Sequence, residues 1–165
     1  MDKKIYLIAE LDDNLQLEIK NIEKIIIENG FIGKQTKDIP YHITLCSFSI
    51  EMENYLKDLL EKISKIFKKI NIKFSSLGLF GLNVLFINPD MNMKLIEIYD
   101  HVKENSFEKE YDLAAHATLI IDEPENIIKI LPKIVDIYKG LNGKIKYISL
   151  YEVFPVRFIK RIELL

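Results

Sequence analysis

Residues 38–45 of the chain read Asp-Ile-Pro-Tyr-His-Ile-Thr-Leu, and residues 112–119 read Asp-Leu-Ala-Ala-His-Ala-Thr-Leu. The two octapeptides begin 74 residues apart and share Asp, His, Thr and Leu at the same places. At an offset of 73, Ile-Lys-Phe-Ser-Ser-Leu at 72–77 matches Ile-Lys-Tyr-Ile-Ser-Leu at 145–150 in four of six positions. Because two separate segments repeat at nearly the same offset, the sequence predicts two copies of one structural unit.

The length of the chain agrees with such a duplication inside one domain. Its 165 residues are close to the size of one ordinary domain, and neither half alone would bury much core. We therefore expect a single domain, 1–165, built from two internal repeats at about 1–82 and 83–165. With 48% apolar residues, 6 Gly and 5 Pro, the composition is that of a folded globular protein.

Charge, cysteine content and hydropathy exclude several classes of protein. A net charge of −2 gives no broad positive field for extended nucleic-acid binding. A lone cysteine, Cys46, excludes an internal disulfide. No run resembles a signal peptide or approaches the roughly 20 apolar residues of a membrane span. We expect a cytoplasmic monomer without a membrane partner.

Apolar periodicity and turn residues predict an α+β fold in which strands and helices alternate. A hairpin is expected at Gly81-Leu82, and a turn at 140–143. The predicted helices are 15–29, about 51–69, about 91–104 and 124–139, and the predicted strands are 4–11, 41–48, 70–80, 83–88, 115–121, 144–154 and 156–164.

The repeated octapeptides carry the chemistry. In a strand, His42 and Thr44 point to one face, as do His116 and Thr118, while the apolar residues between them point to the other face. Two imidazoles with ordinary pKa values near 6.5 supply a general base and a general acid at neutral pH, and two Thr hydroxyls donate hydrogen bonds to phosphoryl oxygens. If the two faces converge, the four side chains are suited to attack on a phosphodiester.

The sequences His42-Ile43-Thr44-Leu45 and His116-Ala117-Thr118-Leu119 resemble the paired His-x-Thr motifs of the 2H phosphoesterase superfamily, which includes the RNA 2′,3′-cyclic phosphodiesterases of the 2′-5′ RNA ligase group. The resemblance covers essentially the whole chain. It implies a bilobal duplicated fold with two antiparallel sheets facing a central cleft and helices on the outside. It also implies metal-independent catalysis, without a cofactor, by the two His and two Thr residues of the motifs.

Further residues are candidates for contacts with a small nucleotide or an RNA end. Lys34 and Lys37 precede the first motif and could meet a phosphate, although solvated loop lysines are the more common situation. Four aromatic residues could stack on a base, with burial in the core as the alternative: Tyr6, Tyr41, Phe48 and Tyr151.

Other polar residues near the motifs have weaker claims. Asp38 and Asp112 could each orient the histidine four residues downstream, or could be turn residues. His101 has no counterpart in the other repeat and is expected to be structural. A zinc site containing His42 and Cys46 is disfavoured, because no third ligand stands at a metal-binding spacing.

The function predicted from the sequence is therefore metal-independent hydrolysis of a cyclic phosphodiester or a 2′-5′ linkage in a nucleotide or RNA end. A sensor that binds a nucleotide or phosphate in the same cleft without turnover is the alternative, and an interaction protein without phosphate chemistry is a third possibility. The copies are equivalent in sequence, so the sequence leaves open which histidine is the acid and which the base.

Overall fold

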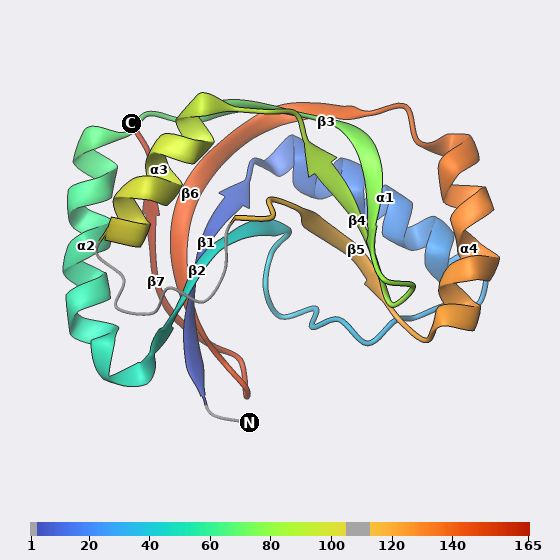
Figure 1. Cartoon of the computed structure of the whole chain (residues 1–165), viewed down its shortest axis with the longest axis horizontal. Coiled ribbons are helices and arrows are strands. Elements are labelled where there is room, and N and C mark those ends of the chain that lie inside the picture. The colour runs from blue at the N-terminus through green and yellow to red at the C-terminus, as the bar shows by residue number, and fades with distance from the viewer. Residues whose placement is uncertain (1–2, 105–112) are drawn as a thin grey trace.

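The computed structural model describes residues 3–104 and 113–165. Seven strands and four α-helices alternate along this part of the chain, with one short 3₁₀ turn between β2 and α2 (Figure 1). In chain order the elements are β1 (Lys4–Leu11), α1 (Asp13–Glu28), β2 (His42–Ser49), the 3₁₀ turn (Ile50–Met52), α2 (Glu53–Ile66), β3 (Ile70–Phe80), β4 (Val84–Pro89), α3 (Met93–Glu104), β5 (Ala117–Ile121), α4 (Pro124–Ile137), β6 (Leu141–Val153) and β7 (Arg157–Glu163).

All strands belong to one antiparallel sheet in the order β2-β1-β6-β3-β4-β5, with β7 added to β6. The expectation of two separate sheets is therefore corrected. The reason is the length of β6, whose 13 residues pair with β3 over Leu141–Ile145 and with β1 from Ile145 onward. One continuous strand thus joins the two halves of the sheet.

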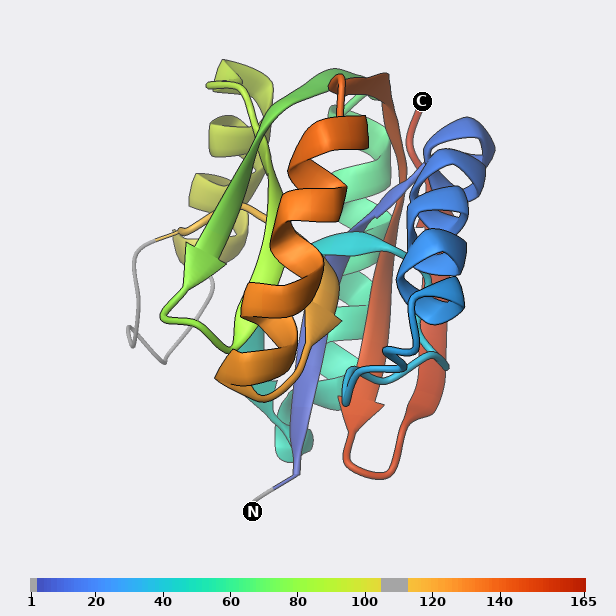
Figure 2. The same ribbon diagram turned by 90° about the vertical axis from the view of Figure 1, so that its right-hand side faces the viewer.

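Helices cover the outer surface of the curved sheet at both ends. Helices α2 and α3 lie against β7, β6 and β2, whereas α1 and α4 lie against β6, β5 and β4 (Figure 1). Viewed from the side, α1 and α4 stand in front of the sheet and α2 stands behind it (Figure 2). In the described residues, no helix has the length and apolar character needed to cross a membrane.

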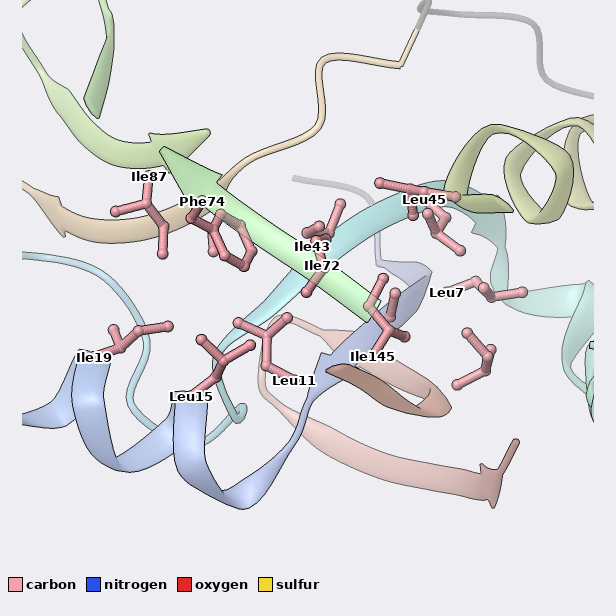
Figure 3. Close-up of a cluster of buried hydrophobic side chains, with 14 of the residues drawn as sticks. Leu7, Leu11, Leu15, Ile19, Ile43, Leu45, Ile72, Phe74, Ile87 and Ile145 are labelled. Atoms are coloured by element: carbon pink, nitrogen blue, oxygen red, sulfur yellow. The ribbon is translucent and has the colours of Figure 1, made fainter. Parts of the chain in front are cut away.

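The core fills the space between the sheet and these helices. Alternate residues of β1 and β2, together with one face of α1, meet apolar residues of β3, β4 and β6 there (Figure 3). Ile43 and Leu45 of the first motif, and Ala117 and Leu119 of the second, are buried in this core. The predicted alternation is therefore correct for 42–45 and 117–119, whereas the strand predicted over 115–121 begins only at Ala117 and leaves His116 just before it.

Several boundaries differ from the predicted ones, and two of the differences have identifiable reasons. Helix α2 ends at Ile66 rather than near 69, because Phe67 adopts an extended conformation and leads into β3. Residues 141–143 are part of β6 rather than a turn. Gly143 pairs with Ile72, and a Cβ atom at Gly143 would lie 2.5 Å from Cγ of Leu15, so a glycine in the strand lets α1 pack closely.

Candidate functional site

The two motifs lie on the two edge strands of the path through the sheet, β2 and β5. Curvature of the sheet brings these edges into contact although they share no ladder of hydrogen bonds. A cavity of about 940 Å³ opens there, and His42, Thr44 and Thr118 line it. Three of the four motif side chains, contributed by both halves of the chain, thus line the same cavity. His116 immediately precedes β5 and lies near enough to act electrostatically on His42.

Each motif histidine is held by the same backbone contact. Nδ1 of His42 lies 2.6 Å from the carbonyl oxygen of Pro40, and Nδ1 of His116 lies 2.6 Å from the carbonyl oxygen of Ala114. A carbonyl only accepts, so Nδ1 carries the proton in both rings. Nε2 of each imidazole is therefore the nitrogen left to exchange a proton with a bound molecule.

These contacts bear on the two alternatives for the aspartates, and for Asp38 they favour the turn residue. The partner of Nδ1 in each ring is the carbonyl two residues upstream. Asp38 lines the cavity and its backbone N–H lies 3.4 Å from Oγ1 of Thr36, which is typical of a turn residue. Asp112 lies outside the described residues.

The surroundings of His42 disfavour a positive charge. Burial lowers its pKa, the bond to Pro40 opposes this shift, and the charge of His116 adds to it. In the ladder, His42 is paired with Glu10 of β1, whose side chain is only 2% exposed. Glu10 is bound by Arg161 of β7 through Nε at 3.1 Å and Nη2 at 2.9 Å. Sequence reasoning missed this pair, because nothing local connects residues 10 and 161.

The surroundings of His116 are aromatic. Its ring centroid lies 4.7 Å from that of Phe80 and 5.0 Å from that of Phe86. Both phenylalanines belong to the β3–β4 hairpin, and they also contact each other at 4.4 Å. No sequence signal distinguished them, since a phenylalanine in a strand ordinarily packs in the core.

The segment from 34 to 41 forms a wall of the cavity. The backbone N–H of Lys34 donates to the carbonyl of Ile121 at 2.6 Å, and the Lys34 ammonium forms an ion pair with Glu123. Lys37 lies 2.9 Å from Glu23. Both loop lysines line the cavity, but each ammonium group already forms an ion pair with a carboxylate. A phosphate bound to either lysine would compete with that carboxylate.

Tyr41, the last residue of this segment, is hydrogen-bonded to α1. Its hydroxyl donates to Glu23 at 2.6 Å, while Gln16 brackets its backbone, accepting from the N–H at 2.9 Å and donating to the carbonyl at 2.7 Å. Partial burial opposes ionisation of Glu23, but the bonds from Tyr41 and Lys37 outweigh it and lower the pKa of the carboxyl. The residue directly before His42 is thereby anchored to α1.

The other three aromatic candidates have different positions. Tyr6 lines the cavity beside the motifs. Phe48 is 0% exposed and belongs to the core, so it is not available to stack on a base. The register explains this: Thr44 pairs with Ile8 and Cys46 with Leu7, so Leu45 is an extra residue that turns Phe48 to the side of Ile5.

Tyr151 is likewise not available for stacking. It pairs with Tyr6 in the ladder but is only 4% exposed, with its hydroxyl 3.4 Å from Nη2 of Arg161. Burial raises its pKa, as does the nearby Glu10 carboxylate. Tyr151 is therefore buried together with Glu10, and the more exposed Arg161 contacts both side chains.

Within residues 3–104 and 113–165, no three His, Cys, Asp or Glu side chains gather as they would around a metal ion. Cys46 lies on β2 beyond Thr44, and burial raises the pKa of its thiol to about 11. His101, on α3, contacts the ring of Phe67 at 5.7 Å and does not line the cavity.

Several solved structures have a similar fold. LigT of Escherichia coli in complex with NADP⁺ is similar over 99% of both chains, with a TM-score of 0.68 and 17% identity. A phosphoesterase matches over 98% of both chains with a TM-score of 0.63 and 17% identity. A protein of Thermus thermophilus matches over 98% of this chain and 97% of its own, with a TM-score of 0.65 and 10% identity.

LigT also matches in its complexes with 3′-AMP and with phosphate. No protein-family model and no curated protein matches the chain. The likeness extends over nearly the whole length of each chain, so the fold is the one that LigT and this phosphoesterase adopt. That agrees with the resemblance to the 2H phosphoesterase superfamily given by the two His-x-Thr motifs.

Proposed function

We propose that the chain is a 2H-type phosphoesterase that hydrolyses a cyclic phosphodiester or a 2′-5′ linkage of a nucleotide or RNA end. The observation that carries this proposal is the matched pair of Nδ1 contacts at 2.6 Å, which leaves one Nε2 on each imidazole for proton transfer. A histidine that only filled space would not need the same tautomer in both motifs.

The two imidazoles and the two Thr hydroxyls are sufficient for the hydrolysis of a 2′,3′-cyclic phosphate. One imidazole takes a proton from water through its Nε2 as the water oxygen forms a bond to phosphorus. The other imidazole, protonated, gives its Nε2 proton to the ribose oxygen as the bond between that oxygen and phosphorus breaks. The hydroxyls of Thr44 and Thr118 donate to the phosphoryl oxygens, where charge accumulates. One proton is taken up and one released in each turnover, so the pair is restored by proton exchange with solvent.

The dimensions of the cavity support a nucleotide rather than phosphate alone. Its volume of about 940 Å³ lies at the upper end of the usual range for small-molecule sites. Tyr6 and Phe154 line it and provide aromatic surface for a base. LigT, which shares the fold, has been crystallised with 3′-AMP and with phosphate.

We also propose that the two halves, about 1–82 and 83–165, arose by duplication within one domain. The element order β1-α1-β2-α2-β3 is followed by β4-α3-β5-α4-β6. Exchanging β1 with β4, β2 with β5 and β3 with β6 reverses the sheet order β2-β1-β6-β3-β4-β5 onto itself. Such a pseudo-twofold relation brings the two equivalent motifs to one cleft.

The proposal is tested by incubating the protein with 2′,3′-cyclic mononucleotides and with a 2′-5′ linked dinucleotide and following product formation. We expect turnover that His42→Ala and His116→Ala each abolish, because the acid and the base are each worth about 10²- to 10⁴-fold. His101→Ala is the matched control and should keep full activity, since His101 lies on α3 outside the cavity. Absence of turnover on both substrate classes would refute the proposal.

The sensor alternative has its own outcome in the same experiment. It predicts that nucleotide binding raises the melting temperature while no product forms.

A further inference from the structure

The β3–β4 hairpin places two phenyl rings against His116. Phe80 is the last residue of β3 and remains 42% exposed, whereas Phe86, in β4, is 4% exposed. The planes of the Phe80 and His116 rings are inclined at 87°, and those of Phe86 and His116 at 55°. Neither phenylalanine belongs to the core cluster under the helices. Their packing therefore serves the concave face and not the main core.

The strand beside Phe86 is shaped to admit this arrangement. Gly78 pairs directly with Phe86 across the β3–β4 ladder. A Cβ atom at Gly78 would lie 2.4 Å from Cε2 and 2.7 Å from Cζ of Phe86. The ring of Phe86 thus lies over the bare backbone of Gly78, and any larger residue there would push it away.

The two motif histidines differ in this respect. In the described part of the chain, His116 contacts two aromatic rings and His42 contacts none, although the Nδ1 bonds of the two are the same. The Nδ1 bond restrains His116 at one corner of its ring. The two phenyl rings restrain its plane, because rotation about the Cβ–Cγ bond would drive the imidazole into them.

We propose that Phe80 is a positioning residue that, backed by Phe86, fixes the plane of the His116 imidazole so that Nε2 points to the reacting phosphorus centre. The inference rests on the proposed phosphoesterase function, which gives the orientation of Nε2 its purpose. A displacement of about 1 Å at a reacting group is enough to cost on the order of 10²-fold in rate. Loss of the outer ring should therefore reduce turnover and leave substrate binding unchanged.

The rival reading is that the exposed surface of Phe80 stacks on a nucleobase. The two readings differ in the constant that changes. Stacking contributes to binding, so its loss raises KM to a degree that depends on the base. Positioning acts on the step that uses His116, so its loss lowers kcat equally for every base.

The kinetic test compares Phe80→Ala with Phe80→Tyr and Leu82→Ala on 2′,3′-cyclic nucleotides carrying different bases. We expect Phe80→Ala to lower kcat about 10- to 100-fold with KM unchanged. Phe80→Tyr should restore the rate because it keeps the ring. Leu82 is an exposed apolar residue of the same hairpin turn, and its replacement should change neither constant. A rise in KM with kcat intact would overturn the inference in favour of stacking, and unchanged kinetics would overturn it outright.

A structural readout separates this inference from the proposed function. In NMR spectra of the wild-type protein, we expect cross-relaxation between the Cε1 or Cδ2 proton of His116 and ring protons of Phe80. Phe80→Leu, which keeps an apolar side chain without a ring, should shift the His116 signals while those of His42 stay in place. If wild-type protein shows these contacts but no turnover, the proposed function fails and not the packing. If it turns over without them, the positioning role is refuted.

Discussion

The burial of His42 has a thermodynamic consequence that can be measured without any substrate. Because burial lowers the pKa of His42 in the folded protein, the unfolded chain binds a proton at this residue more readily than the folded chain does. The free energy of unfolding therefore rises with pH through the region below the ordinary value of 6.5, and stability is lost as the pH falls. His42→Gln removes the titrating group and should remove this part of the pH dependence.

The magnitude has an upper limit. Between pH 7.5 and 5.5, the protonated fraction of an ordinary histidine with a pKa of about 6.5 rises from roughly one tenth to roughly nine tenths in the unfolded chain. If the folded protein takes up no proton at His42 over this interval, the lost stability amounts to about 1.4 kcal/mol, and partial uptake makes it smaller. The paired carboxylates contribute little here, since Glu53, Glu61 and Glu163 have lowered pKa values and titrate at more acid pH.

Urea unfolding at pH 7.5, 6.5 and 5.5 measures the effect. The wild-type protein should lose up to about 1.4 kcal/mol more than His42→Gln between the two extreme pH values. Thr44→Ala is the matched control, because it removes a neighbouring polar side chain of the same strand and no proton-binding group. Parallel pH dependences for wild type and His42→Gln would show that the folded and unfolded chains bind protons alike at this residue, and the argument from burial would be wrong.

Substitutions in the core, in the cavity lining and at the Glu10–Arg161 ion pair have further expected outcomes. Phe48→Ala should lower the free energy of unfolding by about 3–5 kcal/mol in urea titrations, because it empties a core site, whereas Tyr6→Ala should raise KM with little change in stability. Gly143→Ala should cost about 1–3 kcal/mol by overpacking against α1, and an unchanged unfolding midpoint would refute the close approach. Arg161→Met should destabilise the protein in urea titrations by leaving the buried Glu10 carboxylate without its partner, and adding Glu10→Gln should recover part of the loss.

The chemistry of the site could be predicted from sequence wherever it depends on local alternation. The strand period of two was enough to place His42 and Thr44 on one face and Ile43 on the other, and the repeat at an offset of 74 pointed to the second motif. The convergence of the two motifs was only a hypothesis, since it depends on the curvature of the whole sheet. The two motif strands, β2 and β5, stand at opposite ends of the strand order, and the contact between β2 and β5 brings the motifs near each other.

The predictions that were wrong involve pairing between distant strands. The same period of two would put Phe48 on the same face as His42. Leu45, however, is an extra residue relative to β1, and beyond it the side chains of β2 point to the opposite faces. Likewise, a turn at 140–143 was the natural interpretation of Gly140 and Gly143, yet pairing with β3 extends β6 through this segment. In both cases the partner strand determined the local conformation, and the short segment by itself did not.

The β3–β4 and β6–β7 hairpins, at the ends of the two halves, make different aromatic contacts. Phe80 ends β3, and at the offset of 73 the equivalent position is Val153, directly before Phe154. Whereas Phe80 packs on His116, Phe154 lines the cavity and is 61% exposed. We therefore expect the second hairpin to contact the substrate.

Phe154→Ala should raise KM for 2′,3′-cyclic nucleotides with kcat nearly unchanged, because stacking on an aromatic ring is worth about 1–3 kcal/mol per base, or roughly 5- to 150-fold. Phe158→Ala is the matched control. Phe158 is also exposed on this hairpin, but it packs on Tyr151 and Arg161 and does not line the cavity. A fall in kcat with constant KM for Phe154→Ala would mean that both hairpins act on the histidines, and the assignment of the second one to substrate binding would have to be abandoned.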